Sequence, residues 1–176
     1  MKSSEQQPLT GKIEVDEFVV GQAEEGQPGR SNGDKIKVVI AIERVKKNGI
    51  GRAYAKVIPD FSAASFKPFF KTHIDEKAKI KTDKWRGYLP LKETYPLLEQ
   101  ELSDNGENFK ELHLVIMSIK GWLRGIHHHC SPEMMQCYLD EFCYRFNRRS
   151  FPNTMLHKLL DRMVKHKPLF LYAQEN

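Results

Sequence analysis

The chain has 176 residues, of which 40% are hydrophobic and 29% are charged, as in an ordinary globular protein with one well-filled core. No apolar stretch approaches the roughly 20 residues of a membrane span, and the polar N-terminus lacks the apolar core of a signal peptide. The three cysteines are odd in number and confined to one region, which excludes a disulfide framework and predicts a cytoplasmic protein. The net charge of +5 is a mild bias towards polyanionic partners.

The N-terminal half predicts a β-sheet. Residues 1–10 are polar and are expected to be disordered. Three strand-like runs follow, and the Asn48-Gly49 step between the second and third is typical of a hairpin, so the three strands predict an antiparallel meander. Ser62 can cap a helix that ends near His73. The short strand after this helix is expected to lie parallel to a strand of the meander. The four predicted strands cover residues 12–20, 35–45, 51–57 and 78–82.

The C-terminal half predicts helices. Residues 88–98 are expected to be helical only in part because Pro90 and Pro96 interrupt them. Ser131-Pro132 is a typical helix start. The other predicted helices cover residues 111–123 and 154–166. The strand and helix order indicates an α/β fold with a mixed sheet in residues 11–150, followed by a helical extension in residues 151–176.

Two carboxylates occupy positions that are costly for a strand. Asp16 interrupts the first predicted strand, and Asp83 follows the last one. A carboxylate at the middle or end of a central strand costs several kcal/mol to desolvate unless a positive group meets it. If the two strands are neighbours, both carboxylates can converge on one cation.

The helix predicted at residues 111–123 offers two further groups for such a site. His113 and Lys120 are seven residues apart, so they project from one face of the helix. An imidazole can join two carboxylates around a divalent metal, and the lysine can hold a phosphate; alternatively, His113 is an ordinary surface histidine. Glu111 is the reserve carboxylate if His113 faces away. Glu17, and Glu14 with it, should point opposite to Asp16 on a regular strand.

Several segments resemble bacterial insertion-sequence transposases of the DDE superfamily, in particular the ISXO2-like group. The most specific is residues 138–149, which are similar to the signature Y-L-D-E-F-x-F-R-x-N-R-R. Residues 13–21 resemble the first catalytic strand V-E-I-D-E-x-Y-V-G, and residues 83–88 resemble the D-x-W-x-G-Y surroundings of the second catalytic aspartate. Residues 29–43 and 113–128 are similar to two further segments, the latter in a subgroup with His as the third catalytic residue.

The resemblance implies a ribonuclease H-like catalytic domain, with a mixed five-stranded sheet flanked by helices, that hydrolyses and joins DNA phosphodiesters. In this chemistry two Mg²⁺ or Mn²⁺ ions, roughly 3.5–4 Å apart, activate the attacking oxygen and stabilise the leaving one. Carried over to this chain, Asp16 and Asp83 match the metal-binding aspartates, His113 matches the third ligand, and Lys120 matches the family's lysine. Because imidazole is a poorer Mg²⁺ ligand than carboxylate, Mn²⁺ is expected to be favoured, or His113 acts as a general acid or base.

The expected partner is DNA, both transposon ends and target, with a homo-oligomer assembled on it and a location in the bacterial cytoplasm at the nucleoid. Several basic clusters and one tryptophan are the candidate DNA contacts. Trp85 can either stack on a base or pack beneath the Asp83 loop, and one arginine of the last cluster can instead pair with an acidic residue of its own helix. The candidates are Lys84, Trp85, Arg86, Lys120, Arg124, His127, His128, Arg145, Arg148 and Arg149.

Departures from the family pattern leave other functions open. Ser118 and Ile126 replace an asparagine and a threonine, and no cysteine pairs precede the first strand where the family has a zinc ribbon. The alternative is a catalytically inactive DNA-binding or oligomerisation remnant of a truncated transposase. A structure-selective nuclease on the same fold is a further possibility. A zinc site in the run from His127 to Cys130 is disfavoured because adjacent residues cannot all face one ion.

Overall fold

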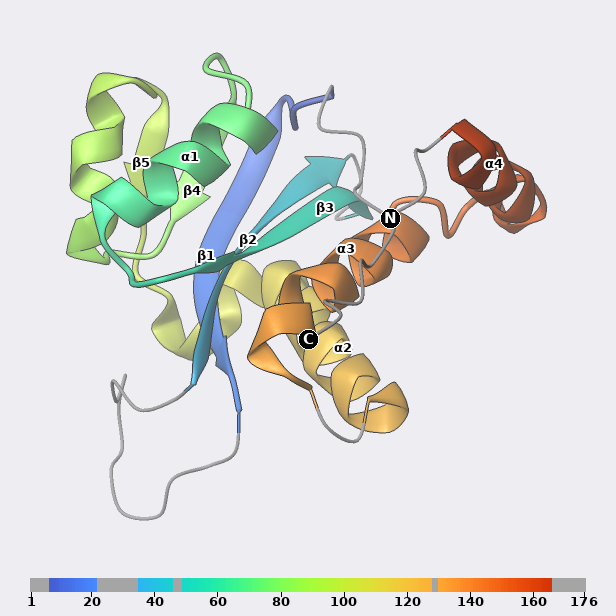
Figure 1. The fold of residues 1–176 in the computed structure, drawn as a ribbon. Helices are drawn as coiled ribbons and strands as arrows, with labels where there is room; N and C mark the ends of the chain where they lie inside the picture. Colours follow the sequence, from blue (N-terminus) through green and yellow to red (C-terminus); the bar gives the residue numbers. More distant parts are fainter. Residues whose placement is uncertain (1–6, 22–34, 46–48, 128–129, 166–176) are drawn as a thin grey trace, which may run out of the picture.

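The computed structural model describes residues 7–21, 35–45, 49–127 and 130–165, except for the side chains of residues 105 and 106. Its centre is a five-stranded mixed sheet of order β3-β2-β1-β4-β5 (Figure 1). The strands are β1 (Lys12–Val20), β2 (Ile36–Val45), β3 (Gly49–Ile58), β4 (Lys79–Thr82) and β5 (Leu98–Gln100). The α-helices are α1 (Ala63–His73), α2 (Lys110–Ile126), α3 (Met135–Phe146) and α4 (Pro152–Lys165). Short 3₁₀ segments are η1 (Arg86–Glu93), η2 (Asp104–Phe109) and η3 (Pro132–Met134).

The predicted topology is confirmed. β1, β2 and β3 form the antiparallel meander, and β4 returns through α1 to lie parallel to β1. Ser62 caps α1, because its hydroxyl accepts a hydrogen bond from the Ser65 N–H at 3.3 Å. The position of the fifth strand, β5, was not predicted; this strand begins at Leu98, where the partly helical segment was expected to end, and pairs with β4.

Two hydrophobic clusters cover the two faces of the sheet. One joins α1 and η1 to the strands through Phe66, Phe69, Phe70 and Tyr88. The other joins α2 and α3 to β1, β2 and β3. The alternation of β1 explains this division, because Ile13 and Val15 belong to the first cluster and Phe18 to the second.

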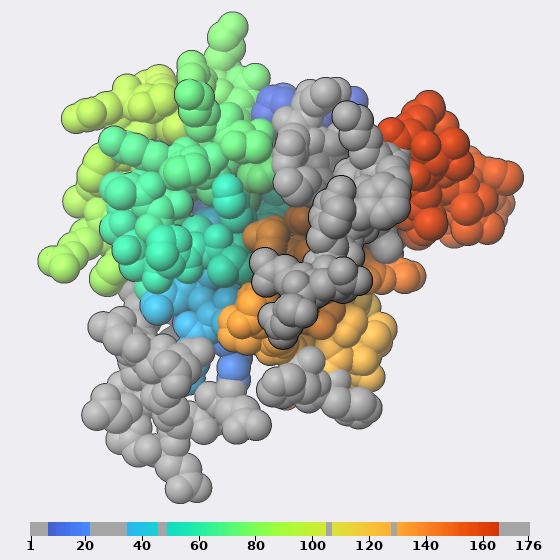
Figure 2. All heavy atoms as spheres, viewed as in Figure 1, coloured from blue at the N-terminus to red at the C-terminus, as the bar shows by residue number. Residues whose placement is uncertain are grey.

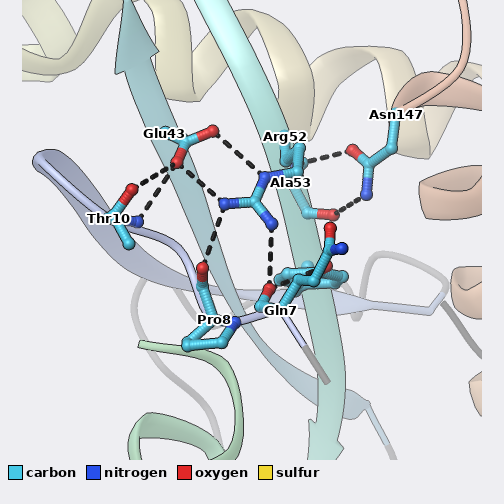
Figure 3. Close-up of polar contacts among 8 residues, drawn as sticks. Gln7, Pro8, Thr10, Glu43, Arg52, Ala53 and Asn147 are labelled. Carbon is cyan, nitrogen blue, oxygen red and sulfur yellow. Dashed lines mark hydrogen bonds and ion pairs between the residues drawn. The ribbon is translucent and has the colours of Figure 1, made fainter. Parts of the chain in front are cut away.

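Residues 7–10 are part of the domain, so the expected disorder of residues 1–10 is wrong for these four; residues 1–6 lie outside the described part. Leu9 is fully buried and its N–H donates to the carbonyl of His73 at 2.7 Å. The guanidinium of Arg52 donates to the carbonyls of Gln7 and Pro8 at 2.9 and 3.0 Å (Figure 3). The same guanidinium binds Glu43, whose Oε1 also accepts the Thr10 N–H at 3.1 Å.

Amide and guanidinium side chains of the α3 region bind the outer edge of β3. Asn147 accepts from the Ala53 N–H at 2.7 Å and donates to the Ala53 carbonyl at 2.9 Å (Figure 3). Gln136 accepts from the Val57 N–H at 2.9 Å and donates to the Ala55 carbonyl at 3.2 Å. The edge strand is therefore satisfied by side chains instead of by another strand.

Helix α4 projects from one side of the molecule (Figure 1, Figure 2). It begins at Pro152, where proline suits the first helical turn, rather than at residue 154 as expected, and none of its residues is buried. It remains attached through Tyr144, whose hydroxyl donates to the Met155 carbonyl at 3.3 Å. Among the described residues, no helix combines the length and apolar character needed to cross a bilayer.

Candidate active site

The two aspartates meet where β1 and β4 part. The parallel register pairs Val15 of β1 with Thr82 at the end of β4, so Asp16 and Asp83 are the residues that follow this pair. One carboxylate oxygen from each of Asp16, Glu17 and Asp83 lies within 4.8 Å of the others. The expected convergence of Asp16 and Asp83 is therefore present, and a third carboxylate joins them.

Glu17 is the residue that the sequence argument missed. As strand alternation requires, it faces the α1 side, opposite to Asp16, and its side chain is buried with 8% exposure. There its Oε2 accepts a hydrogen bond from the Tyr88 hydroxyl at 2.6 Å. Because β4 has already ended, the Glu17 carboxylate still reaches the two aspartates. Burial, and next the charge of Glu17, raise the pKa of Tyr88 well above its usual range, so its hydroxyl stays protonated and donates this hydrogen bond.

The segment after Asp83 fixes the orientation of its carboxylate. Asp83 Oδ1 accepts the Trp85 N–H at 2.9 Å, and Gln100 donates to the Asp83 and Trp85 carbonyls at 3.1 and 2.9 Å. The Trp85 indole packs against the α1-side core and donates to the Phe61 carbonyl at 2.7 Å. Of the two expectations for Trp85, the structure shows packing.

Gly87 completes this segment because no larger residue fits there. A Cβ atom at Gly87 would lie 2.5 Å from the Phe61 carbonyl oxygen and 2.8 Å from the indole nitrogen of Trp85. Real Cβ contacts are not that short. The spacing Asp-x-Trp-x-Gly-Tyr thus has a physical meaning in this chain: Asp83 enters the site, Trp85 and Gly87 lock the turn, and Tyr88 holds Glu17.

His113 faces the acidic residues from α2. Its Nε2 lies 3.4 Å from Asp16 Oδ2, and its side chain is 39% exposed. Glu111, the reserve carboxylate, is occupied elsewhere: its Oε2 lies 2.6 Å from Arg44 Nη1, and this hydrogen bond holds the pKa of Glu111 below its usual value. The first turn of α2 therefore directs the imidazole, and not the carboxylate, towards Asp16.

A family comparison agrees with this geometry. The family model of the ISXO2-like transposase domain matches residues 8–147, which are most of the chain and include Asp16, Glu17, Asp83 and His113. The chain belongs to this family. It is a transposase domain of the DDE superfamily, with the α/β fold and mixed sheet expected for a ribonuclease H-like domain. No curated protein and no solved structure shows a significant similarity to it.

Lys120 of the transposase domain lies two turns beyond His113 and close enough to Asp16 to interact with it. Its ammonium group is 5.5 Å from the centre of the Phe18 ring. Burial, and then the charge of Arg124, lower the pKa of Lys120, while Asp16 opposes this shift. The amine is therefore partly desolvated beside the acidic site, and a phosphate bound there would favour its charged form.

The other candidate DNA contacts of the transposase domain fall into two sets. Lys84 and Arg86 follow Asp83 directly and are exposed, and Arg124 is exposed one turn after Lys120. His127 is instead stacked on Tyr138 at 4.0 Å between ring centres and packs edge-on against Trp122. His128 lies outside the described residues.

The three arginines at the end of α3 and just after it are bound within the transposase domain. Arg145 pairs with Glu141 at 2.7 Å, the arrangement foreseen for one of them. Arg148 lies over the Tyr144 ring at 3.9 Å. Arg149 donates to the Gly51 and Ile50 carbonyls at the edge of β3, two strands away from β1. DNA contacts by these arginines stay a prediction, and their observed partners are structural.

Proposed function

We propose that this transposase domain hydrolyses and joins DNA phosphodiesters with divalent metal held by Asp16, Asp83 and His113. The observation that supports this most directly is the convergence of Asp16, Glu17 and Asp83 within 4.8 Å at the point where two parallel strands part. Carboxylates so close together repel one another, and a cation between them offsets that repulsion. Oxygen ligands suit Mg²⁺ and Mn²⁺, and the imidazole of His113 favours Mn²⁺. Bound metal would activate the attacking oxygen and stabilise the leaving oxygen.

Each residue of the site has a separate part in this proposal. Asp16 and Asp83 supply the ligand oxygens, and the Glu17 and Trp85 N–H groups orient them. Glu17, fixed by Tyr88, adds negative charge beneath the two aspartates. Lys120 binds a non-reacting phosphate oxygen of the DNA strand. His113 either completes the ligand set or transfers a proton, since its Nε2 lies beside Asp16.

Mn²⁺ binding and DNA nicking test the proposal together. Calorimetric titration with Mn²⁺ and nicking of supercoiled plasmid should both be lost in Asp16→Asn and Asp83→Asn. The removal of a metal ligand is worth several kcal/mol, so nicking should fall at least about 10³-fold. Glu93→Gln, which removes an exposed carboxylate at the end of η1, is the matched control and should behave as the unmodified protein. Undiminished nicking in either aspartate variant would sink the mechanism.

His113→Glu separates the two roles of the histidine. A metal ligand should tolerate this change, and nicking with Mg²⁺ should be maintained or raised, because carboxylate is the better Mg²⁺ ligand. Complete loss of nicking with intact Mn²⁺ binding would assign His113 to proton transfer. If the unmodified protein neither binds Mn²⁺ nor nicks DNA, the chain is a DNA-binding or oligomerisation remnant. Faster cleavage of branched than of linear DNA would instead identify a structure-selective nuclease.

A further inference from the structure

The α2-side face of the sheet is open over β4 and β5. Among the described residues, the core cluster beneath α2 and α3 contains no side chain from either strand. The outward residues of these strands instead line a pocket of about 630 Å³, together with the start of β1 and the end of β2. Its polar lining comprises Lys12, Glu14, Arg44, Lys79, Lys81 and Glu99.

The strand register arranges these charges in pairs that lead to the acidic site. On β1 and β4, Lys12 lies beside Lys79, and Glu14 lies beside Lys81. The next pair on the same face is Asp16 with Asp83, because side chains two residues apart share a face. These three pairs form one row of charged side chains along β1 and β4, called the track below. The lysine pair lies at one end of the track and the aspartate pair at the other. Four residues of strand separate them, or about 13 Å at roughly 3.3 Å per residue.

The lysine pair differs from the other cations of the track. Lys81 binds Glu101 at 2.6 Å, and Arg44 binds Glu111 and Glu14. Lys12 and Lys79 are both exposed, and neither makes an ion pair with another described residue. Like charges directly opposite each other on neighbouring strands are destabilising. An anion between the two ammonium groups would remove this cost.

Glu14 lies two residues before Asp16 and shares its face of the sheet, so the expectation that it points opposite to Asp16 is wrong. It does not block the track. Its Oε1 lies 3.5 Å from Arg44 Nε, and Lys81 is its neighbour on β4. The Glu14 carboxylate thus has a cationic neighbour on each side, Arg44 on β2 and Lys81 on β4, between the acidic and basic ends of the track.

We propose that Lys12 and Lys79 together bind one backbone phosphate of the DNA strand whose reacting phosphate lies at Asp16 and Asp83. This inference rests on the proposed function, because it takes the acidic pair as the reaction centre. Neighbouring strands are about 4.8 Å apart, so both ammonium groups can reach the same phosphate. At a rise of about 3.4 Å per nucleotide in a B-form strand, the 13 Å between the pairs corresponds to about four nucleotides, and to fewer in an extended strand.

Salt-dependent binding of a fluorescein-labelled oligothymidylate tests the lysine pair. Fluorescence anisotropy in Ca²⁺ buffer gives Kd as a function of salt for the unmodified protein and for Lys12→Gln/Lys79→Gln. Each lost phosphate contact lowers the slope of log K against log salt by about 0.7 for a single strand, so loss of the one phosphate held by both lysines predicts a decrease of about 0.7. Binding at low salt should weaken about tenfold.

The matched control is Lys67→Gln/Lys71→Gln, which removes the same charge from exposed positions of α1, on the other face of the sheet. Its salt slope should stay at the value of the unmodified protein, and equal slopes for the two double variants would overturn the proposal. Both lysines of the pair are exposed and like-charged, so their double variant should unfold at the same temperature as the unmodified protein or slightly above it. Lys79→Gln alone should give a smaller slope change than the double variant, because Lys12 still contacts the phosphate.

Mn²⁺ titration of the same variants separates this inference from the proposed function. If Mn²⁺ binds the unmodified protein and the lysine substitutions leave the salt slope unchanged, the phosphate subsite is wrong and the metal site stands. If no Mn²⁺ binds but the lysine substitutions lower the slope, the metal mechanism is wrong and the lysine pair remains a DNA contact. Loss of Mn²⁺ binding in Lys12→Gln/Lys79→Gln would contradict the inference, because it would place these lysines in the metal site itself.

Discussion

The sheet contains two acidic sites whose surroundings are opposite. At one end, Glu43 is held by the Arg52 guanidinium at 3.0 and 3.2 Å and by the Thr10 N–H (Figure 3). At the other, Asp16, Glu17 and Asp83 face one another. The first arrangement joins residues 7–10 to β2 and β3, and its charges stabilise the fold. The second places like charges together at a cost, which indicates that its use lies in binding.

The largest expected effect on stability comes from Arg52→Met. This change leaves Glu43 and the carbonyls of Gln7 and Pro8 without their common donor, so the free energy of unfolding should fall by about 2–3 kcal/mol. Urea denaturation measures it. Lys165→Met, which breaks an exposed pair with Asp161, is the control and should change stability by at most about 0.5 kcal/mol. Equal effects would show that the Arg52 network is as unimportant as a surface ion pair.

Tyr88→Phe should come next. The buried Glu17 would lose the donor that lies 2.6 Å from its Oε2, and this should cost about 1–2 kcal/mol in urea denaturation. Nicking activity should fall as well, since the carboxylate beneath the aspartates loses its anchor. Tyr95→Phe changes a similarly buried tyrosine away from the site and should affect neither quantity as much. Full nicking activity in Tyr88→Phe would show that this anchor is not needed for the reaction.

Neutralising one carboxylate at each of the two acidic sites should change the free energy of unfolding in opposite directions. In metal-free buffer, Asp83→Asn relieves repulsion among three carboxylates, so the free energy of unfolding should rise by about 1 kcal/mol. Glu43→Gln weakens its bonds to Arg52 and should lower it by about the same amount. Thermal unfolding of the two variants side by side gives the comparison. A loss of stability in both variants would remove the distinction between the two acidic sites.

The smallest effect is the pH dependence contributed by Glu43. Burial alone would raise its pKa, but hydrogen bonds from Arg52 and Thr10 outweigh burial and lower the pKa from its ordinary value of 4.5. The folded state therefore holds the proton less tightly than the unfolded state. The resulting stability is present above pH 4.5 and is lost as the pH falls through the folded value. Denaturation at several pH values should show the difference between the unmodified protein and Glu43→Gln shrinking in acid, and a constant difference would contradict it.

Much of the sheet could be predicted because its signals are local. Two-residue alternation and the cap at Ser62 locate β1 to β4 and α1 to within a few residues. The three-residue strand β5 has no such signal, since it follows Pro96 and is defined only by its pairing with β4. The order of residues 7–10 was also missed, because it depends on Arg52, more than forty positions away.

The site was predictable in part for the same reason. Asp16 and Asp83 stand out in their own strands, and helical spacing places His113 and Lys120 on one face. Alternation also assigned Glu17 correctly to the opposite face, but a period-two argument says nothing about where the neighbouring strand ends. For Glu17, the only available signal was the adjacent Asp-Glu pair in the family's first catalytic strand. No sequence signal predicted the ion pair between Glu111 and Arg44, because these two residues meet only through tertiary packing.

The parallel pairing of β1 with β4 has a consequence for how the protein reaches its working state. β1 and β2 can pair soon after both are made, which provides Asp16 and Glu17 on a local hairpin. Asp83 arrives only when β4 closes a long loop across α1, and such distant contacts form slowly. A divalent ion that binds this site would favour the closed chain over the open one by mass action. In refolding experiments, the appearance of metal affinity would therefore report the moment at which the two halves of the sheet have joined.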